Sequence, residues 1–105
     1  MPLPKRHKDQ LQQLDLRLFV AGSGARSLRT IDSVKRACEK HAPGRYVLSI
    51  VDVYLHPEDA LKNQVVAVPT LIRRYPEPIR MFVGEIRTPA VLDPHFAGLS
   101  NAPKF

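Results

Sequence analysis

The chain has 105 residues, of which 44% are hydrophobic and 25% are charged, and its formal net charge at pH 7 is +6. This length corresponds to one small domain, and the apolar content is sufficient for a single core. No run approaches the ~18 consecutive apolar residues of a membrane-spanning helix, and residues 1–10 lack the apolar region of a secretion signal. We therefore expect a cytoplasmic protein that has no membrane partner.

The basic excess lies in the first half of the chain. Residues 1–45 carry ten basic and four acidic side chains, whereas residues 46–105 carry six of each. The single cysteine, Cys38, excludes an internal disulfide and favours a reducing compartment. The four histidines are scattered without metal-ligand spacing, and no phosphate-binding glycine motif is present. We expect neither a metal site nor a cofactor.

Residues 1–13 are predicted to form a flexible basic N-terminal arm. Apolar residues alternate over 14–20, which predicts a strand that ends at the glycines of the 21–24 turn. Ser27 can cap a helix in which apolar residues recur every three to four positions, and Pro43-Gly44 ends this helix.

The β-branched run over 46–53 predicts a second strand, and its continuous apolar character indicates burial on both faces. A short helix is expected from Pro57, followed by a strand that ends near residue 72, a proline turn over 75–78 and a strand over 79–83. Residues 87–105 are predicted to be an irregular C-terminal tail, because Pro89 and Pro94 limit any helix there to about one turn.

The resulting order, β-α-β-α-β-β, is the plan of a thioredoxin-like α/β fold with a shortened C-terminal element. Its first two strands would be parallel and its last two would form an antiparallel hairpin. A thioredoxin-like redox enzyme needs a C-x-x-C motif between the first strand and the first helix, yet residues 21–27 contain no cysteine. Cys38 lies on the apolar stripe of the helix, where it is expected to be a small buried hydrophobe.

Several short segments in order carry a family resemblance: Leu18-Phe19-Val20-Ala21-Gly22, Ser27-Leu28-Arg29, Val51-Asp52-Val53, Pro57 with Ala60, Ala67-Val68-Pro69-Thr70-Leu71, Pro76-x-Pro78-Ile79-Arg80 and Gly84-Glu85-Ile86. With these segments, residues 14–86 resemble the KaiB family of bacterial circadian clock proteins. The resemblance implies a non-enzymatic regulator that binds the hexameric ATPase KaiC and modulates its phosphorylation cycle.

KaiB-type chains are known for two folds, so the resemblance also offers an alternative, the tetramer-type order β-α-β-β-α-α-β. It implies that the folds diverge in a fold-switch segment from Pro69 to Glu85, which here includes Pro76, Pro78 and Gly84. The proline before the third strand is expected to have a cis peptide bond. A shortened final helix would leave apolar sheet surface in water, so we expect a homo-oligomer, either a dimer or a tetramer.

The basic first helix supplies the expected partner-binding residues, which are Arg26, Arg29, Lys35 and Arg36. Such a surface suits an acidic protein partner. The chain lacks the acidic tail of the family and ends in Lys104-Phe105, so a stress or signalling pathway is weighed beside a circadian one. Two alternatives stay open: a basic nucleic-acid-binding domain, and a degenerate thioredoxin-like redox protein. No nucleic-acid-binding motif supports the first, and nucleic acid is not an expected partner.

Overall fold

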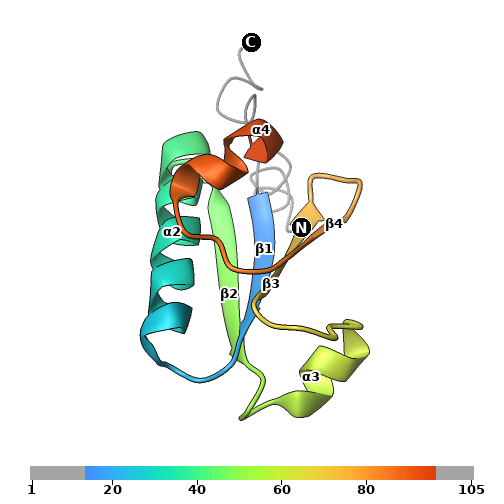
Figure 1. Ribbon diagram of the computed structural model, residues 1–105. Coiled ribbons are helices and arrows are strands. Elements are labelled where there is room, and N and C mark those ends of the chain that lie inside the picture. Colours follow the sequence, from blue (N-terminus) through green and yellow to red (C-terminus); the bar gives the residue numbers. More distant parts are fainter. Residues whose placement is uncertain (1–13, 97–105) are drawn as a thin grey trace.

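A computed structural model describes residues 14–96, and the expected N-terminal arm lies outside them. The described residues form one four-stranded sheet with helices, and the strand order is β2-β1-β3-β4 (Figure 1). The elements in chain order are β1 (Leu14–Val20), α2 (Ala25–His41), β2 (Tyr46–Asp52), α3 (Pro57–Lys62), β3 (Thr70–Tyr75), β4 (Arg80–Val83), the 3-10 helix η1 (Pro89–Leu92) and α4 (Asp93–Phe96). The predicted thioredoxin-like order is confirmed, and the tetramer-type order is not the one adopted.

The strand pairing follows from the connections between the strands. β1 and β2 are parallel in the register Leu14↔Tyr46 to Val20↔Asp52, because α2 carries the chain back to the starting edge. β3 lies antiparallel to β1 on its other side, and the short turn after Tyr75 returns β4 antiparallel to β3. The ends of β1 and β2 and the start of β3 therefore lie at the same end of the sheet (Figure 1).

The core lies between one face of the sheet and α2. The alternation predicted for β1 places Leu14, Leu16, Leu18 and Val20 on this face, each at most 2% exposed. Helical side chains fill the opposite side of the same cluster, and they include Val34, Ala37 and Cys38. The i, i+3, i+4 spacing of these three positions is what turns one stripe of the helix toward the sheet.

The prediction that β2 is covered on both faces is wrong. β2 is an edge strand, and Val47 and Ile50 are 56% and 42% exposed. The face of the sheet away from α2 also leaves Met81 and Val83 of β4 exposed, whereas Phe19 in the centre is fully buried. A run of apolar residues shows that a segment is a strand, but its burial depends on its place in the sheet.

The stretch from residue 87 onward differs from the irregular tail that its prolines predict. Its described part, 87–96, forms η1 and α4, which lie against α2 (Figure 1). Leu92 and Phe96 are 1% and 0% exposed and belong to the core. Pro89 and Pro94 both lie in the first turn of a helix, where proline costs no hydrogen bond. The final helix is short, as expected, but it completes the core.

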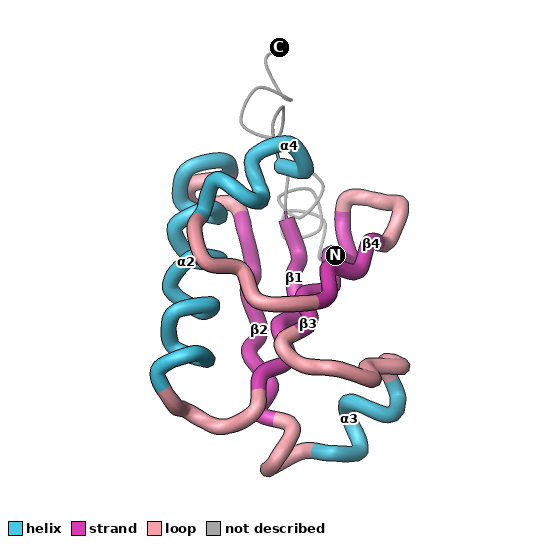
Figure 2. The backbone as a smooth tube through the Cα atoms, viewed as in Figure 1, coloured by secondary structure: helices cyan, strands magenta, loops and turns pink. Residues whose placement is uncertain are grey.

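The Val68–Pro69 peptide bond is cis, as expected for the proline before the third strand, and the Tyr75–Pro76 and Glu77–Pro78 bonds are also cis. Loops gather at the end of the sheet where α3 lies (Figure 2). No helix within residues 14–96 combines the length and apolar character needed to cross a membrane.

Candidate functional site

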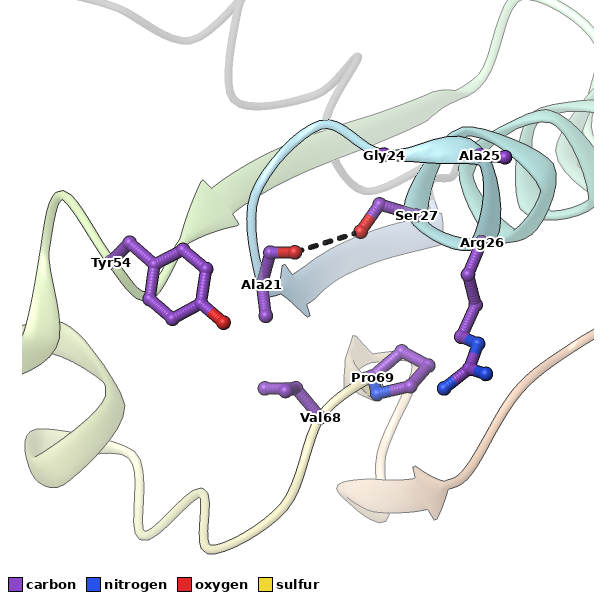
Figure 3. A pocket seen from close by; sticks show the side chains of 8 residues that line it. All are labelled: Ala21, Gly24, Ala25, Arg26, Ser27, Tyr54, Val68 and Pro69. Carbon is purple, nitrogen blue, oxygen red and sulfur yellow. Dashed lines mark hydrogen bonds between the residues drawn. The ribbon is translucent and has the colours of Figure 1, made fainter.

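Three loops meet at one end of the sheet and surround a cavity of about 460 Å³, which we call the loop groove. The turn from β1 into α2 contributes Ala21 and residues 24–27, the loop after β2 contributes Tyr54, and the segment before β3 contributes Val68 and Pro69. Tyr54 and Arg26 flank this space from opposite sides, with Val68 and Pro69 between them (Figure 3). The groove occupies the position where a thioredoxin-like enzyme would carry its reactive thiols, but none of its lining residues is a cysteine.

Asp52 holds two of these loops together. Its Oδ1 accepts hydrogen bonds from the backbone N–H of Gly22 at 3.0 Å and of Tyr54 at 2.9 Å. Gly22 has a φ of +75°, a conformation that favours glycine, and a Cβ there would lie 3.4 Å from the Tyr54 ring. Ser27 closes the turn by donating its hydroxyl to the carbonyl of Ala21 at 3.1 Å. One wall of the groove is therefore fixed by short contacts.

The predicted fold-switch residues lie at two ends of the β3–β4 hairpin. The backbone N–H of Gly84, which has a φ of +113°, donates to the carbonyl of Pro69 at 2.9 Å beside the groove. Pro76 and Pro78 lie in the turn at the opposite end, where the Arg73 guanidinium donates to the carbonyl of Pro78 at 3.0 Å. The structure thus joins Pro69 to Gly84 and separates them from the other two prolines.

Glu85 links this segment to the basic helix. Arg29 donates to its carboxylate at 3.2 Å, and the guanidinium groups of Arg26 and Arg87 lie at 4.0 Å and 3.9 Å from it. We call these four residues the arginine cluster. The Glu85 side chain is 19% exposed, whereas those of Arg26 and Arg29 are 77% and 54% exposed. Two of the predicted partner-binding residues therefore meet a predicted fold-switch residue and keep a net positive surface in water.

The other two predicted partner-binding residues lie further along α2. Arg36 is seven positions from Arg29, which places both on one face of the helix, and its Nε lies 2.9 Å from Asp32 Oδ2. Lys35 is exposed beside it in the sequence. The structure does not join these two residues to the arginine cluster. Arg26, Arg29 and Arg36 share one face of α2 and form what we call the basic stripe, whereas Lys35 lies about 100° around the helix from Arg36 and outside this stripe.

A second polar network closes the C-terminal end of α2. His41 Nε2 and Lys40 Nζ lie 2.8 Å and 3.1 Å from the carboxylate of Asp93, at the start of α4. Hydrogen bonds from His41 and then Lys40 lower the pKa of Asp93. Arg73 donates to the carbonyl of His95 at 3.2 Å and is 9% exposed. Burial, and then the charge of Arg80, lower the pKa of Arg73. This network fastens α4 to α2 and β3.

Cys38 is fully buried on the sheet-facing side of α2, as predicted. Burial, and then the negative charge of Glu39, raise the pKa of its thiol to about 12. The thiol is therefore protonated and shielded at neutral pH, which is the opposite of a redox nucleophile. Between residues 14 and 96, no three side chains of the metal-binding kinds gather into a site.

Sequence reasoning missed Tyr54, Val68 and Arg87. Tyr54 is 74% exposed although it follows an apolar strand, and Val68 is 37% exposed beside Pro69. The only sequence signal for Tyr54 was its position, because it is an aromatic residue two positions after Asp52. Arg87 was missed although it is only two positions after Glu85, because it lay in the stretch predicted to be irregular.

Comparison with known proteins adds to this geometry. A family model described as the KaiB domain matches residues 17–92. A curated relative, the circadian clock oscillator protein KaiB of Prochlorococcus marinus subsp. pastoris, is 34% identical over 71 residues, which are 68% of this chain and 66% of the relative. This span is slightly less than two thirds of the relative's length.

Two solved structures have a similar fold. One is the N-terminal domain of SasA from Synechococcus elongatus, with a TM-score of 0.62 and 23% identity over 87% of this chain and 79% of that domain. The other is chloroplastic thioredoxin z, with a TM-score of 0.63 and 14% identity over 87% of this chain and 82% of the thioredoxin. At these identities the likeness concerns the fold alone.

Proposed function

The chain belongs to the KaiB family, and on that premise we propose that it is a non-enzymatic regulator that binds a KaiC-type ATPase. In this proposal it modulates the ATPase and phosphorylation cycle of that partner in the cytoplasm, within a circadian or a stress and signalling pathway. The partner and the mode of action are those that the resemblance to the family implies.

The observation that carries the proposal is the exposed basic stripe of α2, whose three arginines contact two carboxylates, those of Glu85 and Asp32, and so keep a positive excess. Arg26 and Arg29 are exposed to water at its N-terminal end, and Arg36 lies on the same helix face as Arg29, two turns further along. An exposed stripe of one charge speeds encounter with an acidic protein surface more than it adds to final affinity. A folded acidic face of the ATPase is the partner surface that fits.

Two further features support a binding role without chemistry. Cys38 is buried and has a raised pKa, and the groove has no thiol at the position where thioredoxin-like enzymes need one. The exposed apolar residues Val47, Met81 and Val83 on the open sheet face support the expected self-association into a dimer or tetramer.

The proposal is tested by binding of the purified chain to a purified KaiC-type ATPase, measured by biolayer interferometry together with ATP hydrolysis. We expect a complex whose association rate falls with rising salt. The double substitution Arg26→Glu and Arg29→Glu should weaken it by about tenfold or more. The double substitution Arg74→Glu and Arg80→Glu is the matched control, because it reverses two exposed charges at the end of the β3–β4 hairpin away from the loop groove.

The absence of any complex with the ATPase in both its ATP and ADP states would contradict the proposal. Equal binding of the double variant and the wild type would show that the basic stripe is not the contact surface.

A further inference from the structure

The loop groove is a concave surface for which the basic stripe does not account. Its volume of about 460 Å³ lies within the range of about 300–1,000 Å³ that is usual for ligand sites. Its lining is mainly apolar and its polar groups are few, the largest being the Tyr54 hydroxyl and the Arg26 guanidinium (Figure 3). A site of this composition can take an apolar side chain and orient it through a few polar contacts.

The rim of the groove has apolar surface that folding leaves exposed to water. Of the lining residues, Tyr54 is 74% exposed and Val68 is 37% exposed. Leu55, next to Tyr54 in the sequence, and Val66, two positions before Val68, do not line the cavity but are 71% and 95% exposed. A small enclosed ligand would leave this rim in water, whereas a longer ligand would cover it. Exposed aromatic and aliphatic residues around a pocket are typical of surfaces that bind protein segments.

The backbone beside the groove can receive another chain. The carbonyl of Ala67 accepts a bond from Thr70 at 2.6 Å and that of Pro69 accepts one from Gly84 at 2.9 Å. Val68, between them, makes no backbone hydrogen bond to any residue of the described range. A free N–H and carbonyl at the edge of a groove can pair with an extended peptide, as when a strand is added to a sheet edge.

The charge around the groove decides the kind of peptide. Arg26 lines the cavity, and it lies with Arg29 and Arg87 around the single carboxylate of Glu85. The 17-residue helix α2 also begins at the groove with no acidic residue in its first turn and no side-chain cap, so its positive end adds to this potential. The surroundings favour negative charge beside the apolar residue of the ligand.

We propose that the loop groove binds an extended segment of a partner protein, in which an apolar side chain enters the cavity and flanking acidic residues face the arginine cluster. The main chain of this segment pairs with the backbone of Val68, and Tyr54 covers its apolar side chain. The site shares Arg26 and Arg29 with the basic stripe, but its binding of a peptide can be measured without the ATPase.

The test uses blocked octapeptides in which leucine or phenylalanine alternates with aspartate or glutamate, and a matched set with lysine in place of the acids. Binding to the whole chain is followed by fluorescence polarisation and by amide chemical shifts. We expect the acidic set to bind and the lysine set not to bind. The shifts should map to residues 21–27, Tyr54 and the 67–69 segment.

Substitutions that preserve the fold locate the site. Tyr54→Ala and Val68→Asp alter exposed side chains, so the melting temperature should hold while acidic-peptide affinity falls by about tenfold. Tyr75→Ala and Val91→Asp are the matched controls, because these residues are 43% and 53% exposed and lie away from the groove. The affinity of these two control variants for the acidic peptides should stay within about twofold of that of the wild type.

The proposal is overturned if the lysine set binds as well as the acidic set, or if no acidic peptide binds at millimolar concentration. Shifts confined to the open sheet face, or a change in self-association instead of peptide affinity in the two groove variants, would also overturn it. None of these measurements involves the ATPase, so their outcome does not depend on whether the proposed function is correct.

Discussion

The two ends of α2 differ in what surrounds them. At its C-terminal end η1 and α4 pack against the helix, Leu92 and Phe96 are buried, and Asp93 joins His41 and Lys40. At its N-terminal end the neighbouring loops leave the groove open, and Arg26 and Tyr54 are more than 70% exposed. One end is built as core and the other as surface, so substitutions at the two ends should affect different properties.

The largest effect is expected from Phe96→Ala at the C-terminal end. Phe96 is fully buried and its ring meets His41 edge-on with centroids 6.1 Å apart. Loss of a buried phenylalanine side chain costs about 3–5 kcal/mol of unfolding free energy. Urea unfolding should show this loss, whereas Val91→Ala, at an exposed position of η1, should stay within about 0.5 kcal/mol. A loss below about 1 kcal/mol for Phe96→Ala would mean that α4 is not part of the core.

A smaller effect is expected from Asp93→Asn, and it should depend on pH. Hydrogen bonds from His41 and Lys40 lower the pKa of Asp93 in the folded protein. Its contribution to stability is therefore complete above the pKa of the unfolded carboxyl, about 3.9, and is lost as the pH falls through the lower folded value. The urea midpoint of the variant should lie below that of the wild type at neutral pH.

The two urea midpoints should converge in strong acid, where both proteins lack the Asp93 charge. Asp32→Asn is the control, because it removes an exposed helical ion pair with Arg36, which contributes little to stability. A midpoint difference for Asp93→Asn that stays constant from neutral pH to strong acid would contradict the role given to the Asp93 charge.

The features at the packed end of the molecule are the ones that the sequence could predict. The alternation of Leu14, Leu16 and Leu18 predicted β1 and its buried face because a strand places alternate residues on one side. Because of Pro89 and Pro94, the helical spacing of residues 92 and 96 was overlooked. Leu92 and Phe96 are four residues apart and lie on one side of a helical turn. Both of these features are local and could be found from spacing.

The candidate site depends on contacts between distant residues. Arg29 was identified as a basic surface residue and Glu85 as part of the fold-switch segment, but their sequence positions are 56 apart. Their meeting requires Ile86 to enter the same core cluster as Val34, which no local pattern indicates. Tyr54 and Val68 were missed for the same reason, because a groove exists only once three loops are brought together.

The smallest effect on stability is expected from Glu85→Gln, at the N-terminal end. The carboxylate has partners that are mostly exposed to water, and such ion pairs contribute about 0–1 kcal/mol. Removal of this charge leaves Arg26, Arg29 and Arg87 without a counter-charge in the cluster. The acidic octapeptides should therefore associate several-fold faster at low salt, and the gain should vanish near ~1 M salt, where screening acts over about 3 Å.

Glu77→Gln, in the β3–β4 turn at the other end of the hairpin, removes the same charge far from the groove and should leave the association rate unchanged. A destabilisation by Glu85→Gln as large as that of Phe96→Ala would mean that the arginine cluster is structural. In that case both ends of α2 would be core, and the division between a packed end and a binding end would be wrong.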